Sequence, residues 1–258
     1  MIFETHAHYD DDRYDEDRFT LIPEIHRNGV DVIIDVGASI QSTKKAMEIS
    51  ERFEYVYAAV GVHPSDIADL NEKTYLWLKE QTQKEKVVAV GEIGLDYYWD
   101  KEEDVQKTQR YWFKRQIELA KEVKLPIIIH SRDAANDTIT CMREAGAKDV
   151  QGVVHCYSYS PELAREFLAM GYHIGVGGVV TFKNSKKLKE TVKSVPIERI
   201  LLETDSPYMT PEPHRGERNR SDYIVHVANT IAELKGMDVN DVYRITTENA
   251  RKLFPKVK

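Results

Sequence analysis

The chain has 258 residues and a mass of 29.8 kDa, a length typical of one large domain or two small ones. Hydrophobic residues make up 41% of the chain and charged residues 31%, which argues against disordered, collagen-like and disulfide-scaffold proteins. A formal net charge of −7 does not by itself indicate a nucleic-acid partner, although a local basic patch could still serve one.

The sequence also carries signals about compartment and partners. No apolar run approaches the roughly eighteen residues that a membrane span needs, so we expect no membrane association. The N-terminus, MIFETHAHYD, has neither the basic segment nor the apolar core of a signal peptide, and Cys141 and Cys156 are the only cysteines. We therefore expect a cytoplasmic protein, and nothing in the sequence indicates an obligate protein partner.

Short runs of β-branched residues alternate along the chain with longer segments whose apolar residues recur every three or four positions. These runs predict eight strands, at residues 2–6, 30–36, 55–61, 87–92, 126–130, 152–155, 172–176 and 200–203. Helices are expected between them, for example at residues 104–123 and 161–170, the latter with Ser160 as N-cap. The alternation predicts an α/β protein: a single TIM (β/α)8 barrel over residues 1–258, with no dividing linker.

Histidines and carboxylates gather at the predicted carboxyl ends of the strands, where a parallel barrel holds its active site. They are His6, His8, Glu92, His130, His155 and Asp205. Because side chains at i and i+2 of a strand share a face, His6 and His8 should point together into the barrel mouth, with Ala7 pointing away. The same alternation turns Cys156 away from His155, which makes this cysteine a poor candidate for a ligand.

Four imidazoles and two carboxylates are more ligands than one tetrahedral metal needs. We therefore expect two divalent ions, which can share a bridging carboxylate and activate a water. Nitrogen and oxygen ligands without thiolate suit zinc, manganese or magnesium, and the sequence does not choose among them. A single buried histidine is more often core than ligand, and His26, His173 and His226 are expected in the core or at the surface.

Seven short motifs follow one another in the chain: THAHYD near the start, GVHP at 61–64, GEIGLDYY at 91–98, HSRDA at 130–134, HCYS at 155–158, ETDSPY at 203–208 and PHRGERN at 213–219. Together they resemble the TatD family of metal-dependent deoxyribonucleases, within the amidohydrolase-like barrels, over essentially the whole chain. The family usually has aspartate before the first histidine pair. This chain has Glu4 there, which leaves fine metal preference open.

The resemblance implies a TIM barrel that holds two divalent ions. One ion would lie among His6, His8, Glu92 and Asp205, and the other among Glu92, His130 and His155, with Glu92 as the bridge. A carboxylate beside a metal-activated water can take its proton, so Asp205 is the candidate general base, with a role as ligand only as the alternative. Glu203, two residues earlier, is expected to orient a ligand from behind.

Substrate-binding residues are expected in the loops after the seventh and eighth strands, which often bind phosphate in barrels. Lys183 follows Gly177-Gly178 in the first loop, and Arg215 lies in the second; a merely solvated loop is the alternative. His63 is expected either to donate a hydrogen bond to a phosphate or leaving group or to cap the following turn. The aromatic residues 97–99 either stack on bases or serve packing.

By resemblance, we expect a deoxyribonuclease that hydrolyses DNA phosphodiester bonds with metal-activated water, as a 3′–5′ exonuclease on single-stranded ends. Two alternatives stay open. The first is a deacylase or amidohydrolase that uses the same binuclear site, for example on aminoacyl-tRNA. The second is a non-catalytic binding protein whose metals staple the barrel.

Overall fold

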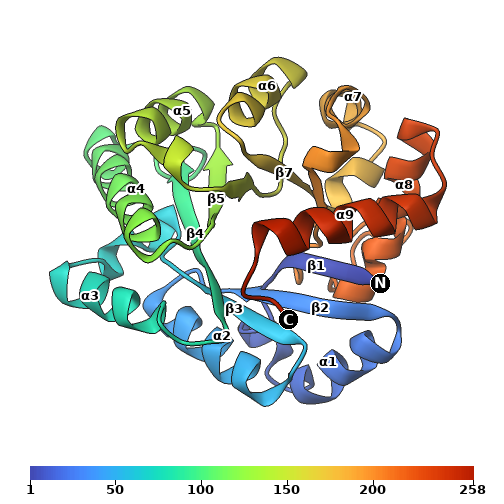
Figure 1. Cartoon of the computed structure of the whole chain (residues 1–258), viewed down its shortest axis with the longest axis horizontal. Coiled ribbons are helices and arrows are strands. Elements are labelled where there is room, and N and C mark those ends of the chain that lie inside the picture. Colours follow the sequence, from blue (N-terminus) through green and yellow to red (C-terminus); the bar gives the residue numbers. More distant parts are fainter.

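The computed structural model describes residues 1–258. Eight parallel strands form one sheet in chain order, surrounded by helices, as predicted (Figure 1). The strands are β1 (Ile2–Ala7), β2 (Val30–Val36), β3 (Val56–Val60), β4 (Val87–Asp96), β5 (Ile127–Arg132), β6 (Gly152–Val154), β7 (His173–Val176) and β8 (Ile200–Leu202). The helices are α1 (Arg18–Arg27), α2 (Ile40–Arg52), α3 (Glu72–Gln81), α4 (Glu103–Val123), α5 (Ala135–Glu144), α6 (Pro161–Ala169), α7 (Lys186–Ser194), α8 (Ile224–Lys235) and α9 (Val239–Leu253).

The barrel closes where the chain just after β8 meets β1. The Asp205 N–H donates to the His6 carbonyl at 2.9 Å, and the His8 N–H donates to the Ser206 carbonyl at 2.7 Å. These two backbone hydrogen bonds bring the first histidine pair and Asp205 to the same seam of the barrel.

The amino-terminal end of the barrel is filled and covered by the C-terminus. Apolar side chains inside the barrel, among them Phe3, Ile34 and Leu201, form one buried cluster with Leu253 and Phe254. The rings of Phe3 and Phe254 stack with centroids 6.1 Å apart. Figure 1 shows α9 crossing beside β1, with the C-terminal residues following it. With this end plugged, only the carboxyl end of the barrel remains for a site.

Six strands end at a different residue than predicted, and three of these differences bear on the site. β4 runs four residues beyond Glu92, because it continues to pair with β5 as far as Asp96 opposite Arg132. β6 and β8 end earlier than predicted, since the chain turns through left-handed conformations at Cys156 (φ 44°) and Asp205 (φ 59°). His155 and Asp205 therefore lie on the loops after their strands. None of the helices combines the length and apolar character of a membrane span.

Candidate metal centre

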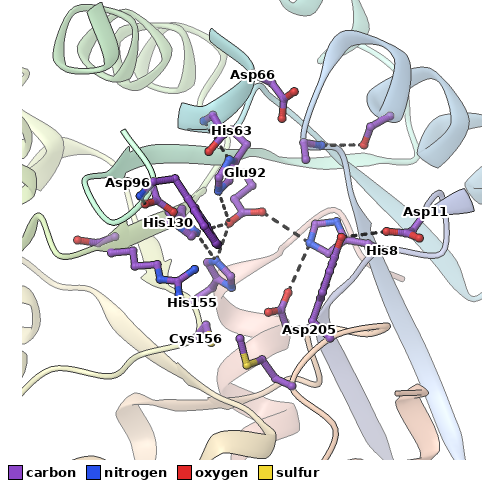
Figure 2. Close-up of a pocket in the computed structure, with 18 of the residues that line it drawn as sticks. His8, Asp11, His63, Asp66, Glu92, Asp96, His130, His155, Cys156 and Asp205 are labelled. Carbon is purple, nitrogen blue, oxygen red and sulfur yellow. Dashed lines mark hydrogen bonds and ion pairs between the residues drawn. The ribbon is translucent and has the colours of Figure 1, made fainter. Parts of the chain in front are cut away.

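A cavity of about 600 Å³ opens at the carboxyl end of the barrel. All the predicted metal ligands line it except His6, which is fully buried beside His8. Figure 2 shows Glu92 at its centre, with His8 on one side and His130 and His155 on the other. Ala7 packs in the outer core between strands and helices, so His6 and His8 share the inward face as predicted.

One oxygen of Glu92 belongs to a first group of donor atoms. Its Oε2 lies 3.6 Å from the Nε2 atoms of both His6 and His8, which are 3.0 Å apart. Asp205 Oδ1 lies 3.8 Å from His6 Nε2 and 3.5 Å from His8 Nε2. Two imidazole nitrogens and two carboxylate oxygens thus surround one position.

The other oxygen of Glu92 belongs to a second group. Its Oε1 lies 2.8 Å from His130 Nδ1 and 2.6 Å from His155 Nε2, and these two nitrogens are 3.3 Å apart. His63 Nε2 lies 3.9 Å from the same oxygen. The two Glu92 oxygens therefore face two different sets of imidazoles.

The spacing and chemistry of these atoms fit divalent cations. Tetrahedral ligands at about 2.0–2.1 Å from a metal are separated from one another by about 3.3 Å. The separations within the first group, 3.0 to 3.8 Å, bracket this value. Mixed imidazole and carboxylate donors without thiolate suit zinc or manganese. In the second group the two imidazole nitrogens are 3.3 Å apart, but Glu92 Oε1 is at hydrogen-bond distance of both, so these side chains would separate by about half an ångström to hold an ion.

Further groups fix the orientation of the imidazoles from behind. The His8 ring donates from Nδ1 to the Val36 carbonyl at 2.7 Å, which leaves Nε2 free to face the cavity. His130 Nε2 lies 3.1 Å from Asp96 Oδ2, which leaves Nδ1 to face Glu92. Hydrogen bonds of this kind hold metal-binding histidines in the right tautomer.

Asp96 also lies in the cavity, although the sequence did not predict it there. The predicted strand stopped at Glu92, so a residue four positions further was not placed in the cavity. Positions 92 and 96 share a face of the longer β4, and both side chains lie at the site. Continued alternation of apolar and polar residues through GEIGLD was the available signal.

Glu92 and Asp205 are ionised at neutral pH. Burial opposes the charge on Glu92, but the electrostatic attraction of His155 and hydrogen bonds with His130 and His155 hold the pKa of this carboxyl well below its usual range. Burial likewise opposes the charge on Asp205, yet its hydrogen bond with His8 lowers its pKa. Burial also opposes the positive charge on His130, but hydrogen bonds with Asp96 and Glu92 raise the pKa of this imidazole to about 9. The anionic carboxylates attract cations, and metal binding releases protons from such imidazoles.

His63 caps a turn, which is one of its two predicted roles, and it also faces the cavity. It precedes the short helix Pro64–Asp69, and its Nδ1 accepts the Ser65 N–H at 3.1 Å. Its Nε2 points toward Glu92. Because Nδ1 is an acceptor, the proton of the neutral ring is on Nε2, where it faces the cavity as a donor.

Glu203 lies behind His155, and its predicted role in orienting a ligand stays a prediction. It is fully buried, its Oε1 is 3.9 Å from His155 Nδ1, and the same oxygen accepts the Cys156 N–H at 2.5 Å. Burial raises the pKa of Glu203 to about 7. A Cβ on Gly175 would collide with Glu203, so glycine at this position makes room for the carboxyl group.

Glu4 replaces the usual aspartate without entering the cavity. Its Oε1 accepts the N–H groups of His6 at 3.1 Å and Thr204 at 2.9 Å, and its Oε2 lies 2.6 Å from the Thr204 hydroxyl. Burial raises the pKa of Glu4 to about 8. Glu4 thus ties β1 to the residues after β8 directly beneath the first group of donors.

Three sequence predictions differ from the structure. Lys183 and Arg215 do not line the cavity: Lys183 is exposed, and the Arg215 guanidinium lies 3.9 Å above the Phe182 ring. Gly178 serves close packing, because a Cβ there would collide with the Met209 carbonyl. Cys156 does line the cavity, since β6 ends before it and the strand alternation no longer applies.

Comparisons with known proteins agree with this geometry. Residues 3–255 match the family described as TatD related DNase. The metal-dependent hydrolase YabD of Bacillus subtilis is 48% identical over 98% of this chain and 99% of its own length. The metal-dependent hydrolase TatD of Mycobacterium tuberculosis is 34% identical over 91% of this chain and 90% of its own.

Solved structures give the same assignment. The TatD homologue YjjV of Escherichia coli K12 superposes with a TM-score of 0.91 and 29% identity, covering 98% of both chains. A TatD family hydrolase of Entamoeba histolytica superposes with a TM-score of 0.86 and 25% identity, over 98% of this chain and 97% of its own. This chain therefore belongs to the TatD family and is a metal-dependent hydrolase.

Proposed function

We propose that this hydrolase binds two divalent ions and cleaves DNA phosphodiester bonds. The observation that carries the proposal is the division of the two Glu92 oxygens between two groups of donor atoms. His6, His8 and Asp205 would hold one ion together with Glu92, and His130 and His155 would hold the other together with the same carboxylate. When bound, such ions polarise the scissile bond and lower the pKa of the attacking water.

The side chains of the chain supply the proton transfers. Asp205 is ionised and lies at the cavity wall, so it accepts a proton from the attacking water and passes it to the leaving oxygen. His63 donates its Nε2–H to a phosphate oxygen. Glu203, whose Oε1 lies 3.9 Å from His155 Nδ1, would orient the His155 ring from behind if a small shift brought the two atoms within hydrogen-bond distance.

A phosphodiester in DNA is supported as the substrate by two observations. The family match is to proteins described as TatD-related DNases. The cavity, at about 600 Å³, has room for a nucleotide but not for an intact duplex. We therefore propose exonucleolytic cleavage of single-stranded ends, from the 3′ end as the family resemblance implies.

A time course with a 5′-labelled single-stranded oligodeoxynucleotide tests this function. With magnesium or manganese, the wild-type protein should produce a ladder that shortens from the 3′ end. Asp205→Asn keeps the shape of the side chain but removes the base, so it should fold normally and lose at least about 100-fold in kcat. Equal activity of the variant would refute the assigned role. Without cleavage under magnesium, manganese or zinc, ester or amide hydrolysis becomes the better assignment.

A further inference from the structure

The cavity rim beside His130 carries two exposed aromatic rings and an arginine. Tyr98 and Trp99 follow β4 with exposed fractions of 44% and 67%, and Arg132 is the last residue of β5. The Arg132 guanidinium carbon lies 3.9 Å from the Tyr98 ring centroid and 5.6 Å from that of Trp99. Trp99 and Arg132 both line the cavity. A tryptophan this exposed beside a reaction site has an apolar face available for a ligand.

This rim is held at a fixed position relative to the metal ligands. Asp96 Oδ1 accepts the N–H groups of Tyr98 at 2.9 Å and Trp99 at 3.2 Å. The other oxygen of the same carboxylate lies 3.1 Å from His130 Nε2. One carboxylate therefore ties the aromatic turn to an imidazole that faces Glu92.

Arg132 carries an uncompensated positive charge. It is the only lysine or arginine that lines the cavity, and it makes no salt bridge and no hydrogen bond through its guanidinium. Figure 2 shows Asp11 on the far side of Glu92 from Asp96. On that side Arg13 also lies over an aromatic ring, that of Tyr208, but Asp11 neutralises it at 3.0 Å. The unpaired positive charge of Arg132 favours binding of an anionic ligand on this side of the cavity.

We propose that Trp99, Tyr98 and Arg132 form a nucleotide subsite for the strand being cleaved. A base stacks on the exposed face of the Trp99 indole, and Arg132 pairs with the adjoining phosphate. In a duplex the faces of each base are covered by its neighbours, so the subsite selects unstacked, single-stranded ends. This inference rests on the proposed nuclease function and assigns residues for its substrate preference.

Two substrates separate stacking from phosphate binding. The first is a single-stranded oligodeoxynucleotide, and the second is the same strand with abasic residues at its 3′ end. Trp99→Ala should raise KM for the normal strand by about 10-fold and leave KM for the abasic strand nearly unchanged. Trp99→Phe should retain most of the affinity, since it keeps a ring. Arg132→Ala should raise KM for both strands.

Tyr111→Ala is the matched control. Tyr111 is 49% exposed and lies near Arg115, but it sits on α4 outside the cavity, and Arg115 pairs with Glu72. This variant should behave like the wild type with both strands. Equal changes for Trp99→Ala with the normal and abasic strands, or no change with either, would overturn the subsite.

A binding measurement keeps this test separate from the proposed function. Stacking of a base on an exposed indole quenches its fluorescence, so oligothymidylate should quench the wild-type protein in EDTA and quench Trp99→Ala much less. If the wild type cleaves neither strand but Trp99-dependent quenching persists, the nuclease assignment fails and the subsite stands. If quenching is absent or independent of Trp99, the subsite is refuted.

Discussion

At the scale of single residues, two carboxylates each use their oxygens for separate tasks. Glu92 directs Oε2 to His6 and His8 and Oε1 to His130 and His155. Asp96 directs Oδ2 to His130 and Oδ1 to the backbone of the aromatic turn. A carboxylate has enough lone pairs for such sharing, whereas an amide has only one acceptor oxygen. Replacing either carboxylate by its amide should therefore weaken the contacts of one oxygen more than the contacts of the other.

The hydrogen bonds of Glu4 predict a specific effect on stability. Glu4→Ala removes the acceptor for the buried N–H groups of His6 and Thr204, so the free energy of unfolding should fall by about 2–4 kcal/mol. Glu4→Gln keeps an acceptor oxygen and should lose clearly less. Urea denaturation of both variants measures the difference. Equal losses would show that the acceptor oxygen kept by glutamine does not account for the effect.

His173, which begins β7 away from the site, predicts a pH dependence. Burial lowers its pKa from 6.5 to about 4, and the positive charges of Arg199 and Lys252 act in the same direction. In the unfolded chain His173 therefore binds a proton near pH 6.5, whereas in the folded protein it binds one only near pH 4. Because the unfolded state gains that proton, this contribution to stability is full above pH 6.5 and falls as the pH drops.

Between pH 7 and pH 5 the loss from this histidine should be about 2 kcal/mol. His173→Gln cannot bind the proton in either state, so its stability should fall by that much less over the same interval. Urea denaturation at both pH values compares the two proteins. A parallel pH dependence of wild type and variant would show that His173 titrates normally in the folded state.

At the scale of elements, β4 and β5 build the side of the barrel that carries Glu92 and His130. Their pairing continues to Asp96 and Arg132, so both residues reach the rim beyond Glu92 and His130. On the opposite end, α9 and the residues after it fill the barrel with Phe254 and Leu253. The site thus stands on rigid strands whose lower ends are packed against the C-terminus.

The plug at the amino-terminal end predicts a large packing effect. Phe254 is fully buried and stacks on Phe3, so Phe254→Ala should lower the free energy of unfolding by about 3–5 kcal/mol. Leu76→Ala, at a position on α3 with 55% exposure, should change it by less than about 0.5 kcal/mol. Thermal denaturation distinguishes the two. A loss below about 1 kcal/mol for Phe254→Ala would contradict the role of the plug.

The order of strands and the gathering of the six histidines and carboxylates followed from sequence, because alternation and strand polarity are local signals. The ends of the strands could not be predicted, because they depend on pairing with neighbouring strands. For this reason the presence of Asp96 and Cys156 in the cavity was not expected. The positions of Arg215 and Lys183 also could not be predicted. Long loops take their course from tertiary packing, here of Arg215 on Phe182.

At the scale of the whole molecule, the barrel has one closed end and one open end, and the two ends differ in polarity. The closed end is apolar, and the open end has a floor of carboxylates and imidazoles below a rim with one free arginine. The chain carries a net charge of −7, so an anionic strand needs compensation at the site itself. Bound divalent ions together with Arg132 would supply that compensation.

Counting the bound metal ions tests the bridging role of Glu92 most directly. Titration of the metal-free protein with manganese, followed by the electron paramagnetic resonance signal of the free ion, should give two ions per chain. Glu92→Gln retains one acceptor oxygen and should bind at most one ion with comparable affinity. A single ion in the wild type, or two equally tight ions in Glu92→Gln, would contradict a centre bridged by this carboxylate.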